Sequence, residues 1–317
     1  MLGRMDARLT RRHLLRSAGA ASLALAAGDL AWAKEDLLER PMPTRKLGGT
    51  GETVSVLALG THPLGKLRDE KAAVALVRRA YDYGITYFDT APSYSRHQAE
   101  RRVGAGLKGL RDKVLIGTKS YLMPKKAAMD ELDASLKALG TDRVDLFQVH
   151  SIRSAKDRDA KLDPEKGTLA AAIQAKKQGK CRYIGVTGHV DPKVMASCLD
   201  IFDFDTVLVP VNCADPLYHS FIKGTLPKAK QSGVAAIAMK VFASGRLVPK
   251  ANADECVRFA LSQDIATASV GVSNLKELEA DVRAAKRNLP MPQAEQAALT
   301  KRFAPHPGTS LEWYKRG

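Results

Sequence analysis

The stretch Val144-Asp145-Leu146-Phe147-Gln148-Val149-His150 decides the fold. It is a short apolar run that ends on a polar side chain, and comparable runs recur at intervals of roughly 30 residues, as in repeated βα units. The runs are apolar on both faces, as buried parallel strands are. Together they make eight predicted strands: Thr53 to Leu59, Ile85 to Asp89, Val114 to Lys119, Val144 to His150, Tyr183 to Thr187, Thr206 to Asn212, Val234 to Met239 and Ala268 to Gly271.

The segments between these runs have the spacing of amphipathic helices. Apolar residues from Ala73 to Tyr81 and from Met129 to Leu139 repeat at helical intervals, and a glycine follows each segment. Asp191-Pro192 is typical of a helix start, with a capping carboxylate and then a proline at the first helical position. Eight strands that alternate with helices predict an α/β fold, a (β/α)8 TIM barrel over residues 34–317. A doubly wound sheet is the alternative and would usually need fewer strands.

Three further segments fall outside the βα rhythm. Arg45 to Thr50 contains glycines and predicts a β-hairpin before the first strand, placed to plug the barrel floor. Ser151 to Gly167 is long and charged, and Pro305 to Gly317 forms a tail that carries Trp313 and Tyr314. Barrels keep variable, substrate-facing parts in such segments.

The N-terminus has the order of a secretory signal. Thr10 to Arg16 contains an arginine pair, Ala18 to Ala27 is mildly apolar, and Ala31-Trp32-Ala33 is a small-x-small pattern. This order predicts a twin-arginine signal peptide over residues 1–33 and export to the periplasm. The alternative is a basic amphipathic tail.

Composition excludes several classes of protein. The 317-residue chain is 45% hydrophobic, yet no run approaches the roughly 20 apolar residues of a membrane span. The net charge of +16 comes from Lys and Arg scattered along the chain, and only 6% of residues are aromatic, so we expect no nucleic-acid binding. The four cysteines form no CxxC pair, which predicts free buried thiols and no metal site.

Gly104 to Gly109 matches the GxGxxG pattern of dinucleotide-binding loops. That pattern binds a dinucleotide only where it follows a strand and opens a helix. Here it ends a predicted helix and precedes a strand, so we interpret the glycines as helix termination and close packing.

Four ionisable residues stand at successive strand exits, where a barrel keeps its active site: Asp89, Tyr94, Lys119 and His150. A tyrosine with its ordinary pKa of about 10 is a poor acid at neutral pH. An ammonium nearby lowers that pKa, and Lys119, held by Asp89, can supply it. His150 can donate a hydrogen bond to a carbonyl oxygen. The set is a proton donor beside a carbonyl, and it requires a hydride source such as a nicotinamide cofactor.

The chain resembles the aldo-keto reductase superfamily from Arg45 to the eighth helix. The motifs that carry the resemblance are Phe88 to Tyr94, Gly117-Thr118-Lys119, Asp145 to His150 and Tyr183 to Thr187. The family's Asp-Tyr-Lys-His tetrad falls on the four strand-exit residues. The resemblance implies NAD(P)H-dependent reduction of a small aldehyde or ketone, with Tyr94 as general acid. It also implies NADP as the cofactor, with NAD possible, and a monomer.

Two segments predict phosphate binding. Ala243 to Leu247 follows the seventh strand, and Gly271 to Asn274 follows the eighth and opens a helix, whose N-terminus attracts anions. Ser273 stands where the family usually has an arginine for the 2′-phosphate, and Lys276 could compensate for it. The cofactor residues that the resemblance implies are Gly60, Thr61, Thr187, Asn212, Met239, Ser244, Gly245, Arg246, Leu247, Gly271, Ser273, Asn274 and Lys276.

The nicotinamide pocket departs from the family pattern. Thr187-Gly188 replaces the family's Ser-Asn, Leu208 stands near the usual glutamine with Asn212 as its substitute, and Met239 replaces the stacking aromatic. This altered pocket, together with export, motivates a second hypothesis, a cofactor-binding regulatory or sensor protein with little turnover. The intact tetrad favours catalysis. A third hypothesis is a basic surface-binding barrel, whose binding would fall steeply with salt.

Overall fold

A computed structural model describes residues 36–287, 290–305 and 308–316. It divides the chain into two units, residues 1–40 and residues 41–317. In the first, a 3-10 turn, Leu37–Glu39, begins with Asp36 Oδ1 accepting the N–H of Leu38 at 3.0 Å. The predicted signal peptide, residues 1–33, lies outside the described residues.

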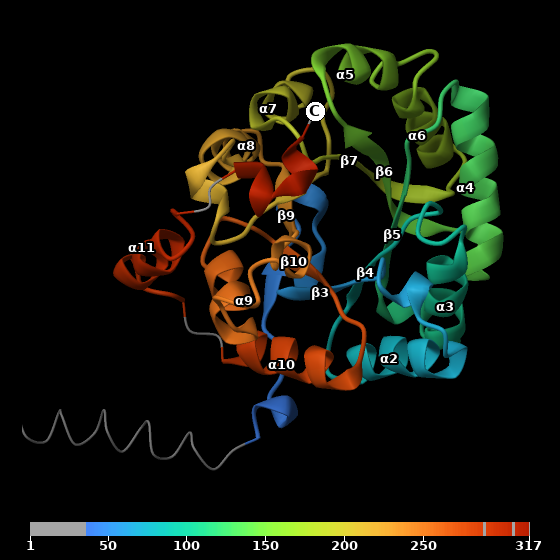
Figure 1. The fold of residues 1–317 in the computed structure, drawn as a ribbon. Coiled ribbons are helices and arrows are strands. Elements are labelled where there is room, and N and C mark those ends of the chain that lie inside the picture. The colour runs from blue at the N-terminus through green and yellow to red at the C-terminus, as the bar shows by residue number, and fades with distance from the viewer. Residues whose placement is uncertain (1–35, 288–289, 306–307, 317) are drawn as a thin grey trace, which may run out of the picture. The chain divides into compact units, whose positions relative to one another are not determined.

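In the second unit, eight parallel strands close into a barrel in the order β10-β3-β4-β5-β6-β7-β8-β9 (Figure 1). This confirms the predicted (β/α)8 barrel. The barrel strands are β3 Leu57–Gly60, β4 Tyr87–Asp89, β5 Leu115–Ser120, β6 Val144–Ile152, β7 Cys181–Gly188, β8 Thr206–Pro210, β9 Ala235–Met239 and β10 Thr267–Gly271.

Helices surround the strands, and their ends follow the sequence signals (Figure 1). Helix α4 stops where Gly140 takes a left-handed conformation with φ 65°, and Asp191 caps α7 by accepting the N–H of Lys193 at 2.7 Å. The α-helices are α2 Glu70–Asp82, α3 Gln98–Gly106, α4 Lys125–Leu139, α5 Ala155–Lys161, α6 Thr168–Lys177, α7 Pro192–Cys198, α8 Phe221–Gln231, α9 Ala253–Leu261, α10 Leu275–Lys286 and α11 Gln293–Lys301. The remaining short turns are η2 Gly48–Thr50, η3 Leu64–Lys66, η4 Arg111–Lys113, η5 Asp215–Leu217, η6 Ala243–Gly245, η7 Gly308–Ser310 and η8 Trp313–Lys315.

The predicted first strand is two strands. Instead of one run from Thr53 to Leu59, β2 Thr53–Ser55 belongs to the hairpin and β3 begins at Leu57. The reason is local, since the Ser55 hydroxyl donates to the Leu57 carbonyl at 2.6 Å and its backbone N–H bonds Thr86 Oγ1 at 3.0 Å. A serine that bonds its own backbone interrupts a strand, and the chain turns from the hairpin into the barrel there.

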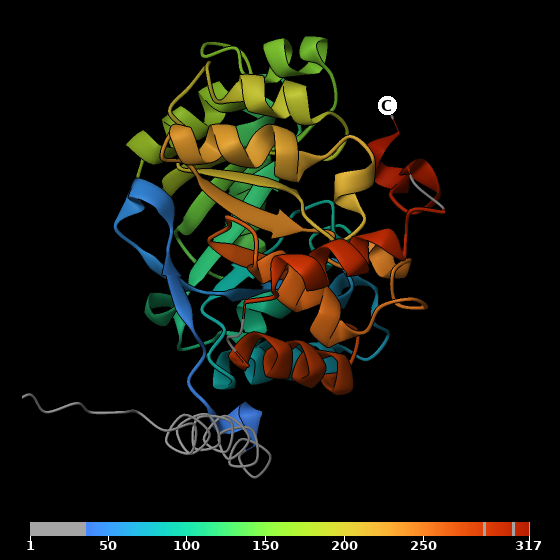
Figure 2. The ribbon, with the colours of Figure 1, turned by 90° about the vertical axis from the view of Figure 1, so that its left-hand side faces the viewer.

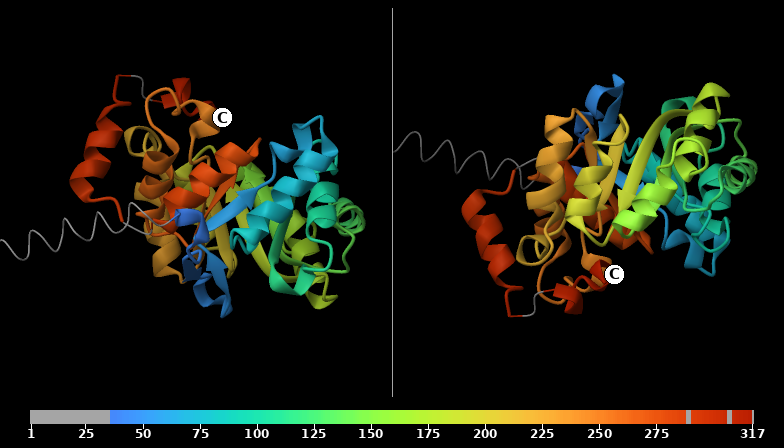
Figure 3. Two further views of the ribbon diagram at one scale, coloured as in Figure 1. Left: turned by 90° about the horizontal axis from the view of Figure 1, so that it is seen from below. Right: turned by 90° about the horizontal axis from the view of Figure 1, so that it is seen from above.

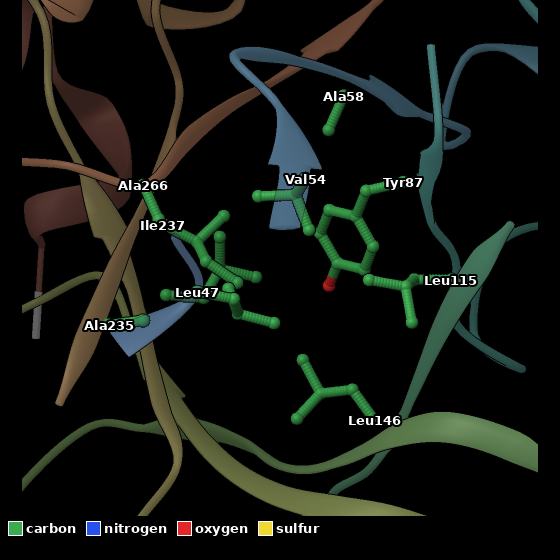
Figure 4. Packing of buried hydrophobic residues seen from close by; sticks show 10 residues of the cluster. Leu47, Val54, Ala58, Tyr87, Leu115, Leu146, Ala235, Ile237 and Ala266 are labelled. Carbon is green, nitrogen blue, oxygen red and sulfur yellow. The ribbon is translucent and has the colours of Figure 1, made fainter. Parts of the chain in front are cut away.

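The hairpin closes the floor of the barrel, as expected. β1 Thr44–Lys46 pairs antiparallel with β2, and Leu47 at the turn is 3% exposed. The next residue must be glycine, because a Cβ at Gly48 would lie 2.9 Å from the Ala235 nitrogen. Figure 4 shows Leu47 side by side with residues from many barrel strands, and the full cluster is Leu47, Val54, Ala58, Tyr87, Leu115, Leu146, Leu208, Ala235, Ile237 and Ala266.

The C-terminal tail lies at the other end of the barrel from the hairpin. Figure 2 and both views of Figure 3 show the hairpin and the residues around η8 at opposite ends of the strands. The charged segment after β6 contains helix α5, which the sequence did not predict. The carboxyl ends of the strands are therefore bordered by α5 and the tail.

The sequence led us to expect no dinucleotide-binding loop at Gly104 to Gly109, no metal site and no membrane span, and the described residues bear on each of these points. The GxGxxG glycines end α3 and precede β5, as interpreted from the sequence. All four cysteines are buried and free, and the described part of the chain gathers no group of three metal-ligating side chains. No described helix has the length and apolar character that crossing a bilayer requires.

Candidate active site at the barrel mouth

A buried ion pair forms the base of the mouth. Lys119 on β5 is 1% exposed, and its Nζ lies 2.7 Å from Asp89 Oδ2 at the end of β4. The ammonium also donates to the Thr90 carbonyl at 2.8 Å. The other carboxylate oxygen accepts from Tyr87 Oη at 3.3 Å and Gln148 Nε2 at 3.2 Å. With both charges bonded on several sides, the pair has a fixed geometry.

Tyr94 lies next to Lys119 of this pair. The Lys119 Nζ is 5.3 Å from the centroid of the Tyr94 ring, and the His62 ring meets it edge-on at 5.1 Å. The next three residues, Ser95, Arg96 and His97, all have left-handed φ values of 55°, 52° and 64°. Non-glycine residues reach this region at a cost, so the turn after Tyr94 must be held by its surroundings.

Glu100 anchors that turn. Its carboxylate, in α3, is fully buried and accepts from the Thr118 hydroxyl on β5 at 2.6 Å. Its other oxygen lies 2.5 Å from His97 Nδ1, the last residue of the left-handed turn. The loop that carries Tyr94 is thereby tied to the strand that carries Lys119. The sequence analysis did not single out Glu100.

The electrostatics correct the expectation that Lys119 lowers the pKa of Tyr94. Burial raises the pKa of Tyr94, and the Lys119 ammonium opposes this without reversing it. Burial likewise works against the charge on Lys119, but Asp89 and Tyr94 outweigh it and the pKa of Lys119 is raised. The tyrosine is therefore a neutral phenol at neutral pH, beside an ammonium that stabilises the phenolate when the proton leaves.

His150 completes the tetrad from β6. It is 9% exposed, and its ring lies 5.8 Å from that of Tyr121. Burial and the charge of Lys119 hold the pKa of His150 well below its ordinary value, so the imidazole is neutral. Its Nδ1 is buried and has no hydrogen-bond partner among the described residues, so this polar atom is unsatisfied in the structure.

Lys240 is a second lysine at the mouth that the sequence analysis missed. It follows Met239 directly at the end of β9 and has φ 58°. Its Nζ lies 5.6 Å from the centroid of Tyr314 and 6.0 Å from that of Trp313, both in the tail. The strand-exit rule that found Lys119 and His150 would also have found Lys240.

The residues after β9 and β10 fit a bound diphosphate. Ser244 and Gly245 in η6 have φ values of 59° and 88°, and in this left-handed turn the Gly245 N–H already donates to the Phe242 carbonyl at 2.8 Å. Gly271 is exposed at the end of β10, and Asn274 caps α10. A helix start and the exposed cation of Arg246 are features that can bind a diphosphate.

Glu277 competes for the start of α10. Its carboxylate accepts the Ser273 backbone N–H at 2.7 Å and the Asn274 side-chain amide at 2.9 Å. This is the position that an anion would take at a helix N-terminus. Lys276 is exposed beside it. A 2′-phosphate at Ser273 would therefore have to displace a carboxylate.

The predicted nicotinamide residues are partly engaged by the chain itself. Asn212 donates to Glu312 Oε1 at 3.1 Å and to Tyr314 Oη at 2.9 Å, and its oxygen accepts two backbone N–H groups. To hold a carboxamide, Asn212 would have to release one of these bonds. Thr187 Oγ1 accepts the Ser151 N–H at 3.0 Å and keeps its own proton to donate.

The other predicted cofactor residues have mixed environments. Thr61 is buried and its hydroxyl donates to the Asp89 carbonyl at 3.1 Å, directly after Gly60 at the end of β3. Met239 is partly buried against the barrel interior, Leu247 is fully buried, and Arg246 donates to the Ser310 carbonyl of the tail. Of these, Leu247 serves packing, and Thr61 positions the strand end that carries Asp89.

The tail is fastened by a buried charge network. Lys315 is 3% exposed, and its ammonium lies 2.8 Å from both Asp215 Oδ1 and Glu312 Oε2. The neighbouring Tyr314 donates to Glu312 Oε1 at 2.9 Å. These bonds hold the tail against the carboxyl ends of β8 and β9.

Eight parallel strands whose carboxyl ends gather a tyrosine, a lysine–aspartate pair and a histidine define a (β/α)8 barrel with a site where barrel enzymes keep theirs. The sequence model of the aldo/keto reductase family matches residues 56–256. The chain belongs to this family.

Two curated relatives and one crystal structure illustrate the match. The chain is 32% identical to L-galactose dehydrogenase of Arabidopsis thaliana over 64% of this chain's length. It is 30% identical to aldo-keto reductase YhdN of Bacillus subtilis over 66% of this chain's length. The matched regions cover 66% and 65% of those proteins, somewhat less than two thirds. The crystal structure of an aldo-keto reductase from Pseudomonas aeruginosa superposes with a TM-score of 0.68 at 26% identity, covering 79% of this chain and 98% of that one.

Proposed function

We propose that this protein reduces an aldehyde or ketone to an alcohol with NADP(H), and that Tyr94 donates the proton. The observation that carries the proposal is the buried Asp89–Lys119 pair, with its ammonium 5.3 Å from the Tyr94 ring. The names of the curated relatives, a dehydrogenase and an aldo-keto reductase, agree with this class of reaction.

The residues divide the chemistry between them. The nicotinamide, when bound, supplies the hydride that adds to the carbonyl carbon. The Tyr94 hydroxyl gives its proton to the carbonyl oxygen, and Lys119 stabilises the resulting phenolate by charge. Asp89 fixes the ammonium, and neutral His150 donates a hydrogen bond that orients the carbonyl oxygen. The turn at Ser244 and the guanidinium of Arg246 would hold the diphosphate, with Thr187 offering a hydroxyl to the carboxamide.

The test follows NADPH and NADH absorbance with a panel of aldehydes and quinones. Wild type should consume cofactor only when a carbonyl compound is present, and Tyr94→Phe should lose about 100-fold or more of that rate. Tyr81→Phe on the outer helix α2 is the matched control. Turnover that survives in Tyr94→Phe would remove the proton donor from the proposal, and absence of any cofactor binding would remove the cofactor.

A regulatory or sensor role is the second candidate. It is favoured by Asn212, whose amide is fully bonded to the tail and to the backbone instead of being free for a carboxamide. In that case wild type and Tyr94→Phe would bind NADPH equally and neither would turn over any member of the panel.

Export remains a proposal from the sequence. The arginine pair Arg11-Arg12 and the Ala31-Trp32-Ala33 pattern support the twin-arginine route to the periplasm. Arg11→Lys with Arg12→Lys should leave the protein in the cytoplasmic fraction of a bacterial host. Periplasmic recovery of that double variant would contradict the proposal.

A further inference from the structure

The ammonium of Lys240 stands at the barrel mouth without a counter-charge. It is partly buried, and the tail aromatics Tyr314 and Trp313 cover it at 5.6 and 6.0 Å from their centroids. Within the described parts of the chain it makes no ion pair and no hydrogen bond. Two buried lysines at this end of the barrel each have a carboxylate partner, Lys119 with Asp89 and Lys315 with Asp215.

Several cations act on the groups around Lys240. Burial first, and then surrounding cations, lower the pKa values of His62 and His150, and lower that of His189 to about 3. Burial and the charges of Lys66 and Lys119 lower the pKa of Lys240 itself. The cations that act on these three histidines are Lys66, Lys119, Arg153, Lys161 and Lys240. Asp89, the carboxylate at the centre of the mouth, is already paired with Lys119.

An ammonium that is partly removed from water and has cations but no carboxylate near it is unfavourable until an anion joins it. Cofactor phosphates have other cationic partners within reach of the predicted phosphate segments, the exposed side chains of Arg246 after η6 and Lys276 at the start of α10. After burial and the charge of Lys119, the charge of Lys240 also contributes to the lowered pKa of His150, the residue proposed to bind the reacting carbonyl. A single ammonium acts as a point charge that can pair with one carboxylate.

We propose that Lys240 binds a carboxylate on the substrate, so that the physiological substrate is a carboxylate-bearing aldehyde or ketone. This inference rests on the proposed carbonyl reduction. Lys240 is in this view a specificity residue, which sets which carbonyl compound is reduced and takes no part in the proton transfer.

The experiment compares matched substrates that differ only in charge. The pairs are 4-formylbenzoate with 4-formylbenzamide, and succinate semialdehyde with its amide, so that two distances between carboxylate and carbonyl are sampled. Wild type should favour the carboxylate in kcat/KM by about tenfold or more, as a charged hydrogen bond predicts. Lys240→Met should bring the ratio close to one, and Lys240→Arg should keep most of it. Lys137→Met, on the exposed face of α4, should behave as wild type.

Three results would overturn the proposal. Wild type could treat both members of each pair alike, or Lys240→Met could keep the preference, in which case Lys240 only packs against the tail. The third is a weaker Kd for NADPH in Lys240→Met with the substrate ratio unchanged, which would assign the lysine to the cofactor.

A binding measurement separates this inference from the proposed function. If no aldehyde is turned over, the proposed function fails, and calorimetric titration with 4-formylbenzoate and 4-formylbenzamide in the presence of NADP+ decides the role of Lys240. Tighter carboxylate binding that is lost in Lys240→Met supports the anion site. Equal binding of the two compounds by wild type refutes it.

Discussion

At the scale of single residues, the site depends on a charge pair that is costly to disturb. Lys119 and Asp89 are 1% and 4% exposed, so each buried charge depends strongly on the opposite charge 2.7 Å away. Tyr94 depends on the same pair, since burial raises its pKa and the Lys119 ammonium is the group that opposes the rise. The residue that tunes the proton donor also holds the strand ends together.

The variant Lys119→Met should therefore lose both stability and activity. It leaves the Asp89 carboxylate buried without a partner, which costs about 3–5 kcal/mol of unfolding free energy. The double variant Lys119→Met/Asp89→Leu should recover most of the stability and none of the activity. Urea unfolding and NADPH consumption measure the two effects, and an active double variant would show that the ammonium is not needed for the reaction.

Glu277 should influence the choice between the two nicotinamide cofactors. Its carboxylate accepts the Ser273 N–H at 2.7 Å, where a 2′-phosphate is expected. Glu277→Gln removes a negative charge there and should shift the ratio of Kd values toward NADPH by about two- to fivefold, because the site is exposed and screened. Glu70→Gln, an equal change of charge on α2, should leave the ratio unchanged. A ratio that moves equally in both variants would reflect net charge alone.

At the scale of elements, the hairpin stabilises the barrel from below while the chemistry lies above. Leu47 is 3% exposed among inward side chains that include Ala235 and Ile237 (Figure 4). Leu47→Ala should cost about 2–5 kcal/mol of unfolding free energy by leaving a cavity. Ile201→Ala, at a residue that is 45% exposed, should cost no more than about 0.5 kcal/mol. Equal midpoints in urea for the two variants would mean that the hairpin does not support the barrel.

Much of this element pattern could be predicted from the sequence because it is local. Apolar runs, the Asp191 cap and the Gly140 stop each act within a few residues. The break at Ser55 was missed because it depends on a hydroxyl that bonds Leu57 and an N–H that bonds Thr86, on the next βα unit. The four tetrad residues could also be predicted, because each lies at or just after the end of an apolar run that the sequence itself shows.

The rest of the site depends on contacts between distant parts of the chain. Asn212 was expected to face a carboxamide, but its amide is bonded by Glu312 and Tyr314, 100 residues further on. The covering of Lys240 by the same tail was equally invisible in the sequence. The pKa of Tyr94 was expected to be lowered, because spacing reveals which charge is near but not how much water is removed.

At the scale of the whole molecule, a strongly basic protein keeps several histidines uncharged. The net charge is +16, and burial together with neighbouring cations lowers the pKa of His150 well below its ordinary value and that of His189 to about 3. In the unfolded chain both histidines bind a proton near pH 6.5. Below that pH the unfolded state holds more protons than the folded state, so stability falls as pH falls.

The size of this loss can be measured against a histidine variant. Each histidine removes up to ~1.4 kcal/mol of unfolding free energy per pH unit below about pH 6.5 until its folded pKa is reached. For His189, with a folded pKa of about 3, this gives roughly 2 kcal/mol between pH 6.5 and pH 5. His189→Gln cannot take up the proton, so its urea midpoint should fall less over this range than that of wild type. His219→Gln, at an exposed residue, is the control and should follow wild type. Parallel curves of urea midpoint against pH for all three proteins would mean that His189 takes up its proton equally in the folded and unfolded states. The positive field at the barrel mouth would then be weaker than inferred, and carboxylate binding at Lys240 depends on that field.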